Sequence, residues 1–152
     1  MIFPNDFIWG TSTAAYQIEG SPLADGASPS IWHDFSHRKG RINNNQHGDI
    51  ACDHYHRYQE DIGHLKELGV KAYRFSVSWP RIVAQPGAIN TKGIDFYRRI
   101  VDLLLEAGIE PYITLFHWET PLWLERQGGF RKRHSVDYLA EYLGEFIFCG
   151  AV

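Results

Sequence analysis

The segment around His117 combines three side chains that suit the recognition of a sugar. His117 is a titratable ring, Trp118 is a large aromatic plate, and Glu119 is a carboxylate. His117 could donate a hydrogen bond to a sugar hydroxyl while Trp118 packs on the apolar C–H face of the sugar ring. The alternative is a core histidine with satisfied hydrogen bonds beside a core tryptophan, and the segment alone leaves both open.

A second candidate for sugar binding is Gln17, which lies in a tract of small and polar residues over 10–20. Its amide carries a donor and an acceptor, so it can bind two neighbouring hydroxyls at once. The alternative is a loop glutamine bonded to the backbone. Both Gln17 and His117 follow predicted strands, which is where parallel α/β proteins place ligand-binding residues.

Arg74 stands between aromatic residues in a segment that alternates like a buried strand. A permanent charge inside an apolar strand needs a partner, because isolated burial of a charge is very costly. We therefore expect a carboxylate near Arg74. In an active site this arginine would keep that carboxylate ionised, and the alternative is a structural ion pair between adjacent strands.

Other chemistries find little support in the sequence. Among the eight histidines, His33 and His37 are spaced i, i+4, but no glutamate follows the first of them as an HExxH helix requires. His54 and His56 are two residues apart and diverge on a helix. Neither standard phosphate-binding glycine loop occurs, nor does a Gly-x-Ser-x-Gly nucleophile elbow. The sequence thus predicts no metal site and no cofactor.

Alternating strands and helices must position these candidates. Period-two runs and helical spacing alternate along the chain, which favours parallel strands joined by helical crossovers. The predicted elements are strands at 7–12, 70–77 and 111–116 and helices that begin near Asp53, Thr91 and Ser135. The stretch 20–51 shows little periodicity and is predicted to be a functional loop.

Two of these helices carry a clear apolar stripe. The expected buried positions are Ile94, Tyr97, Val101 and Leu104 in the second helix and Val136, Leu139, Leu143 and Phe146 in the third. A closed eight-unit barrel usually needs about 250 residues. The 152 residues present therefore predict either an open sheet or a piece of a larger barrel.

Composition and charge exclude several classes of partner. With 15 basic and 18 acidic residues and a net charge of -3, the chain lacks the basic footprint of proteins that bind nucleic acid or anionic membranes. No apolar stretch approaches membrane-spanning length and the start lacks a secretory signal, so a cytoplasmic location is expected. The two cysteines, Cys52 and Cys149, are too far apart for a zinc pair and are expected to be buried thiols.

Several long motifs, in order, resemble glycoside hydrolase family 1, the β-glucosidases and their relatives. The first runs from Phe3 to Gly20 and contains Trp-Gly-Thr-Ser-Thr-Ala-Ala-Tyr-Gln-Ile-Glu-Gly. The others are residues 29–32, 48–58, 73–82 and 108–118. The resemblance runs from Phe3 to about Phe146.

The resemblance implies a (β/α)8 TIM barrel of which this chain holds the first three βα units, as the amino-terminal part of a single domain. It implies retaining hydrolysis of terminal β-D-glucosides or similar β-glycosides without metal or cofactor. By the same resemblance Gln17 and His117 bind hydroxyls of the non-reducing sugar, Trp118 lies beside them, and Arg74 supports the nucleophilic glutamate. Tyr16 resembles the branch that acts on unphosphorylated sugars.

Two departures from the family pattern matter. The family commonly has His-Trp-Asp-Leu-Pro where this chain has His-Trp-Glu-Thr-Pro at 117–121, which leaves the two sugar-contact positions intact. The family's acid/base lies in an Asn-Glu-Pro motif and its nucleophile in a Glu-Asn-Gly motif, and neither motif occurs in these 152 residues. Residues from about 147 no longer resemble the family, which suggests a truncation, a frame change or a partial sequence.

These departures predict that the isolated chain contains no catalytic residue, is inactive and marginally folded, and self-associates through an exposed sheet edge. Two alternatives remain open. One is a non-catalytic carbohydrate-binding remnant or interaction protein. The other is a self-contained hydrolase that uses Glu19 and Glu119, which requires carboxyl groups about 5–5.5 Å apart for retention or about 6.5–9.5 Å apart for inversion.

Overall fold

The protein, studied as a computed structural model, is described over residues 2–148. Its centre is a three-stranded parallel sheet in the order β1-β2-β5, formed by β1 (Gly10–Ser12), β2 (Ala72–Ser76) and β5 (Glu110–Thr114). Three predicted strands and their parallel pairing are therefore confirmed. β1 is shorter than expected, although one further hydrogen bond, from the Lys71 amide to the Trp9 carbonyl at 2.8 Å, precedes it.

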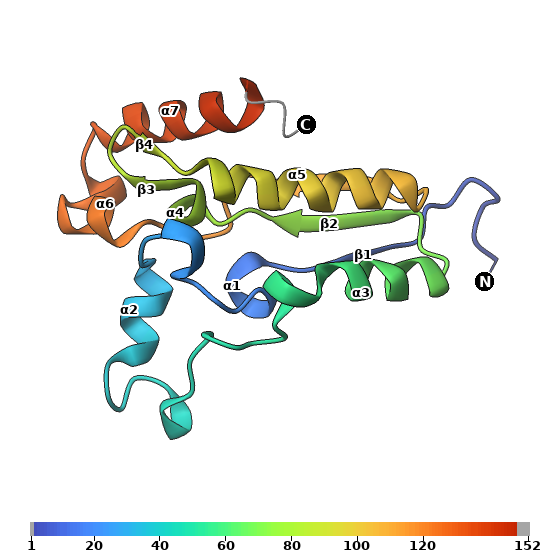
Figure 1. The fold of residues 1–152 in the computed structure, drawn as a ribbon, viewed down its shortest axis with the longest axis horizontal. Coiled ribbons are helices and arrows are strands. Elements are labelled where there is room, and N and C mark those ends of the chain that lie inside the picture. The colour runs from blue at the N-terminus through green and yellow to red at the C-terminus, as the bar shows by residue number, and fades with distance from the viewer. Residues whose placement is uncertain (1, 149–152) are drawn as a thin grey trace.

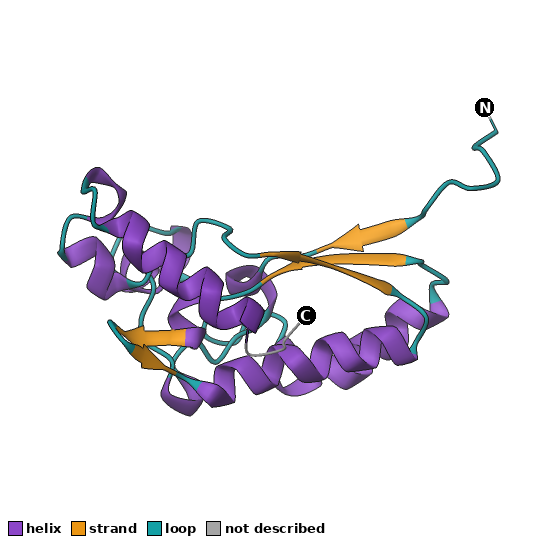
Figure 2. Cartoon of the chain, turned by 90° about the horizontal axis from the view of Figure 1, so that it is seen from above, coloured by secondary structure: helices purple, strands orange, loops and turns teal. Residues whose placement is uncertain are grey.

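The crossover helices α3 (His54–Glu67) and α5 (Thr91–Glu106) lie along one face of this sheet, and the opposite face carries none of the long helices (Figure 2). The stripe predicted for α5 is buried: Ile94, Tyr97, Val101 and Leu104 are all 8% exposed or less. These side chains join the aromatic residues of β2 in one apolar core. The architecture of three consecutive βα units is thus the one that the resemblance implied.

The segment predicted as a loop over 20–51 contains short helices. They follow α1 (Ala15–Ile18) and comprise η1 (Ala24–Gly26), α2 (Ile31–His37) and η2 (Asn43–Asn45). Ser30 caps α2, because its hydroxyl accepts a hydrogen bond from the His33 amide at 3.1 Å. Figure 1 shows α2 beyond the carboxyl end of β2, opposite the amino terminus of the chain.

Each of the remaining connections also holds small elements that the sequence did not predict. α4 (Trp79–Ile82) and a hairpin of β3 (Val83–Gln85) and β4 (Ala88–Ile89) follow β2, and α6 (Leu122–Arg126) and η3 (Gly129–Arg131) follow β5. β2 ends at Ser76, four residues before Pro80, and Pro80 lies in the first turn of α4.

The last helix, α7 (Ser135–Phe148), buries a different face from the one that the sequence predicted. Val136, predicted to be buried, is 45% exposed, whereas Tyr142 is fully buried and stacks on Trp79 at 4.9 Å between ring centroids. The side chain of Phe146 lies outside the described residues, as does Cys149. The shift arises because α7 packs against η3 and α4, the helix that carries Trp79.

The expectation of a buried Cys52 is wrong, and the start of α3 lacks a side-chain cap. Asp53 occupies the N-cap position of α3, but its carboxylate bonds to the His56 ring at 2.6 Å and makes no side-chain cap on the backbone. Cys52 is exposed rather than buried. Across residues 2–148, no helix combines the length and the apolar character that crossing a membrane would require.

Candidate functional site

One cavity of about 290 Å³ gathers the three side chains that the sequence marked for sugar binding. Gln17, His117 and Trp118 line it together with four other residues, Ala14, Ala15, Tyr16 and Trp32. Gln17 comes from α1 just past the end of β1, and His117 and Trp118 follow the end of β5. The cavity therefore lies at the carboxyl ends of the strands, where parallel α/β proteins bind ligands.

Hydrogen bonds to β2 hold α1 in place beneath Gln17. The Ala15 amide donates to the Ser76 hydroxyl at 2.8 Å, and the Thr13 amide donates to the Arg74 carbonyl at 2.9 Å. The Gln17 side chain is exposed, so its amide is free to face a ligand. The alternative was a loop glutamine bonded to the backbone, and among the described residues no hydrogen bond joins the Gln17 side chain to the backbone.

The backbone of Trp118 adopts a conformation that is rare for residues other than glycine. Its φ is +69°, in the left-handed region, and its indole is 69% exposed. Such conformations cost of order 1–3 kcal/mol and cluster at functional sites. The alternative of a core tryptophan is thus wrong for Trp118, which presents its ring to the cavity together with Trp32, 41% exposed on α2.

Arg74 differs from the expectation that its charge would be buried. Its side chain is exposed, and its Nε donates to the Thr114 hydroxyl on the neighbouring strand at 2.8 Å. The register sets Ser12, Arg74 and Tyr112 side by side across the three strands. All three are exposed, because they lie on the face of the sheet that the long helices leave uncovered. The charge of Arg74 is therefore solvated.

The two carboxylates proposed for a self-contained hydrolase belong to a buried network instead. Glu19 accepts from Arg81 Nε at 3.1 Å and from the Tyr97 hydroxyl at 2.7 Å, and Glu119 accepts from the Ser78 hydroxyl at 2.9 Å. Glu19 is 4% exposed and Glu119 is 7% exposed. The cavity beside them measures about 10 Å³, room for one water at most. A sugar cannot reach this pair.

Burial raises the pKa of the Glu119 carboxyl to about 8, and the negative charge of Glu19 adds to the rise. Burial and the same charge place the pKa of the Tyr97 hydroxyl well above its ordinary value. Glu119 is therefore protonated at neutral pH, and Arg81 compensates the charge of Glu19. The sequence did not indicate that Arg81 is buried and paired with Glu19, because the two residues are 62 positions apart in the chain.

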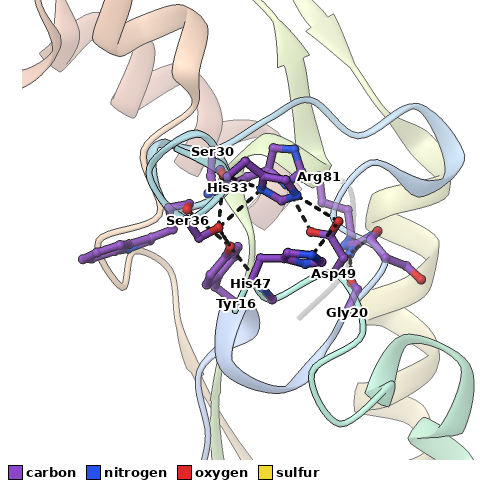
Figure 3. Close-up of polar contacts among 12 residues, drawn as sticks. Tyr16, Gly20, Ser30, His33, Ser36, His47, Asp49 and Arg81 are labelled. Atoms are coloured by element: carbon purple, nitrogen blue, oxygen red, sulfur yellow. Dashed lines mark hydrogen bonds and ion pairs between the residues drawn. The ribbon is translucent and has the colours of Figure 1, made fainter. Parts of the chain in front are cut away.

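A group with the spacing of metal ligands lies beside α2. The side chains of His33, His37 and Asp49 each offer one ligand atom, and these atoms all lie within 4.8 Å of one another. Figure 3 shows His33, His47 and Asp49 pointing toward one another. The sequence, in which only the His33/His37 spacing was visible, predicted no metal here.

The sequence of this chain is similar to a family model and to known proteins. The family model "Glycosyl hydrolase family 1" matches residues 1–149. Beta-glucosidase A of Thermotoga maritima is 57% identical over 141 residues, 92% of this chain and 32% of the relative. Beta-glucosidase A of Acetivibrio thermocellus is 56% identical over 147 residues, 96% of this chain and 33% of the relative.

Solved structures agree with these sequence matches. The family 1 β-glucosidase from Thermotoga maritima, alone and in complex with glucoimidazole, superposes with a TM-score of 0.90 and covers 92% of this chain. This chain covers 32% of those structures, so it spans about a third of the length of the relatives it matches. With matched motifs, matched fold and a family model over nearly its whole length, the chain belongs to glycosyl hydrolase family 1.

Proposed function

We propose that this chain forms the amino-terminal part of a single barrel domain that hydrolyses terminal β-D-glucosides or similar β-glycosides with retention of configuration. The observation that carries the proposal is the shared cavity of Gln17, His117 and Trp118. Membership of the family and the β-glucosidase names of the relatives support the reaction class.

In this proposal the cavity holds the non-reducing sugar. The Gln17 amide binds two neighbouring hydroxyls, His117 binds another, and the exposed faces of Trp118 and Trp32 pack against the C–H patches of the ring. The Thermotoga maritima relative has been solved with glucoimidazole and with deoxynojirimycin. These sugar-like molecules support a small carbohydrate as the ligand, and Tyr16 favours an unphosphorylated one.

The catalytic carboxyl groups are proposed to come from sequence other than these 152 residues, which contain neither the Asn-Glu-Pro nor the Glu-Asn-Gly motif. Retention needs one carboxyl to attack the anomeric carbon and another about 5–5.5 Å away to protonate the leaving oxygen. In this proposal Arg74, exposed on the uncovered face of the sheet, holds such a nucleophile ionised. The isolated chain is therefore proposed to be inactive.

A chimera tests this proposal. Residues 1–146 would be joined to the part of Thermotoga maritima β-glucosidase A that follows its matched segment, and release of nitrophenol from nitrophenyl β-D-glucoside measured. We expect turnover by the chimera and none by the 152-residue chain. Gln17→Ala in the chimera should lower kcat/KM by roughly 10- to 100-fold, the loss of one or two hydrogen bonds, while Gln59→Ala on the exposed surface of α3 should not.

The second candidate is a non-catalytic carbohydrate-binding protein, favoured by one observation: Gln17, His117 and Trp118 line one cavity in a chain that contains neither catalytic motif. A folded chimera without turnover, together with a 152-residue chain that binds glucose in a calorimeter, would support that candidate. Turnover that survives in the isolated chain and responds to substitution of Glu119 would instead contradict both.

A further inference from the structure

Three imidazole rings surround the carboxylate of Asp49. His33 Nδ1 lies 3.5 Å from Asp49 Oδ1, and His37 Nε2 and His47 Nδ1 lie 3.1 Å and 3.4 Å from Asp49 Oδ2. The rings also contact one another, with centroids 4.2 Å apart for His33 and His37 and 4.5 Å apart for His37 and His47. His33, His37 and Asp49 thus each bring one potential ligand atom within 4.8 Å of the other two, and Figure 3 shows His47 pointing toward Asp49 beside them.

The hydrogen bond behind His37 fixes which of its nitrogens faces this point. His37 Nδ1 lies 2.8 Å from the carbonyl oxygen of His33. A carbonyl oxygen only accepts, so Nδ1 carries a proton. Nε2 donates to Asp49 Oδ2 at 3.1 Å in the protonated ring, and release of that proton would free its lone pair for a metal ion. A histidine that binds a metal usually donates its other ring N–H to a backbone carbonyl or carboxylate in this way.

Two buried atoms at this point face each other and make no hydrogen bond. Among the residues that the structure describes, neither His33 Nδ1 nor Asp49 Oδ1 has a hydrogen-bond partner, although both are shielded from solvent. Buried polar atoms are nearly always satisfied, and an exception needs an explanation. A cation between these two facing atoms would satisfy both.

The distances and the donor set select the class of cation. Zinc bonds of about 2.0–2.1 Å to nitrogen and oxygen place tetrahedral ligands roughly 3.3 Å apart, close to the 3.1–3.5 Å separations around Asp49. Mg²⁺ and Ca²⁺ prefer all-oxygen ligands, whereas imidazole suits Zn²⁺, Ni²⁺ and Cu²⁺.

We propose that His33, His37 and Asp49 form a binding site for one divalent transition-metal ion of the Zn²⁺ type. His47, whose Nδ1 lies 3.4 Å from Asp49 Oδ2, would turn toward the bound ion as the fourth ligand. These four residues lie within 33–49, so this chain supplies all of them. It is independent of the proposed glucosidase activity.

The position of the site assigns it a structural role. The ion would fasten α2 to the segment that follows η2. That segment reaches α1 through Tyr16, whose hydroxyl bonds to the Ser36 hydroxyl at 2.8 Å and accepts from the Gly48 amide at 3.4 Å. Trp32, on the same helix as two of the ligands, lines the sugar cavity. Metal binding should therefore stiffen one wall of that cavity.

Calorimetric titration of the metal-free 152-residue chain with ZnCl2 tests the proposal. We expect one ion per chain and a higher midpoint of thermal unfolding with Zn²⁺ present. His37→Gln and Asp49→Asn each remove one ligand and should weaken the affinity roughly tenfold or more. His64→Gln, which alters an exposed histidine of α3, is the matched control and should leave the affinity unchanged.

Circular dichroism of each variant tests whether the fold is retained. The same titration of the chimera shows whether the ion still binds when the rest of the barrel is present, so the result does not depend on the stability of the isolated chain. Cu²⁺ should show nitrogen hyperfine coupling from imidazole in its EPR spectrum. Absence of stoichiometric binding in both folded proteins would overturn the proposal. Equal affinity in wild type, His37→Gln and Asp49→Asn would also overturn it, because the ion would then bind elsewhere.

Discussion

The two arginines near the sheet have opposite environments, and the sequence assigned the buried charge to the wrong one. Arg74 alternates onto the uncovered face of β2 and reaches solvent, whereas Arg81, on α4, is 2% exposed and bound to Glu19. Alternation along a strand shows which residues share a face, but the contacts of other elements decide which face is covered.

A pair of matched substitutions follows from this contrast. Arg81→Met should lower the free energy of unfolding by about 3–5 kcal/mol, because it leaves the buried carboxylate of Glu19 uncompensated. Arg74→Met should change it by less than about 0.5 kcal/mol, as expected of an exposed site. Urea unfolding at one fixed protein concentration measures both, and equal effects would contradict the assignment.

Glu119 should make stability depend on pH. Its folded pKa of about 8 lies above the ordinary 4.5, so the folded state keeps a proton that the unfolded state releases. The contribution of Glu119 to the free energy of unfolding is fully present below about pH 4.5. It is lost as the pH rises to about 8, and the free energy of unfolding falls by up to about 1.4 kcal/mol per pH unit in this range.

Glu119→Gln isolates this contribution, because the amide keeps the acceptor for Ser78 and removes the titration. The difference in unfolding free energy between wild type and Glu119→Gln should shift in favour of the variant between pH 5 and pH 8. Subtracting one profile from the other also cancels the contribution that histidines make to the unfolding free energy over the same pH range. Parallel profiles would show that Glu119 is not protonated in the fold.

Elements with strong local periodicity were predictable, and those built on distant contacts were not. α5 follows from its apolar stripe and from the glycine after it, but α2 and the β3–β4 hairpin occupy segments without a period. The hairpin is held by bonds that no local pattern reveals, such as the Asn90 side chain donating to the Arg81 carbonyl at 2.9 Å. Short elements of this kind need the rest of the fold for their stability.

Two glycines in helices test the packing between elements. A Cβ at Gly93 of α5 would lie 2.2 Å from the Arg81 carbonyl oxygen, whereas a Cβ at Gly63 of α3 would meet nothing within 4 Å. Gly93→Ala should lower the unfolding free energy by about 1–3 kcal/mol or more through overpacking. Gly63→Ala should raise it by about 0.5–1 kcal/mol through higher helix propensity. Stabilisation by Gly93→Ala would contradict the close approach of α4 and α5.

At the scale of the whole molecule, the sheet has unpaired edges and an uncovered face. In the described sheet β1 and β5 each pair with β2 on one side only, and Tyr112 on β5 is 52% exposed. Exposed edges and apolar side chains promote pairing between chains. We therefore predict that the isolated chain self-associates as its concentration rises.

Sedimentation velocity over a concentration series measures this association. Tyr112→Lys should reduce it, since a charge on an edge strand opposes pairing. Leu105→Lys changes an apolar side chain of similar exposure, 56%, on α5 and serves as the control. A monomer at all concentrations, or equal effects of both substitutions, would contradict association through the sheet edge.

The candidate site was predictable only where residue type and position in the fold coincide. Gln17, His117 and Trp118 follow strand ends, so the order of elements alone suggested where they would lie. Trp32 and Asp49 come from the segment over 20–51, whose path depends on contacts with α1 rather than on local pattern. The sequence therefore did not predict that Trp32 lies beside the cavity or that Asp49 lies among the histidines.

The central claim, that this cavity is a sugar site, is tested most directly by saturation-transfer NMR between the 152-residue chain and methyl β-D-glucoside. Saturation should pass to the ring protons of the sugar, and Gln17→Ala and His117→Ala should each sharply reduce the transfer while Gln59→Ala leaves it intact. Absence of transfer from the folded chain, or transfer that persists equally in Gln17→Ala and His117→Ala, would contradict the account.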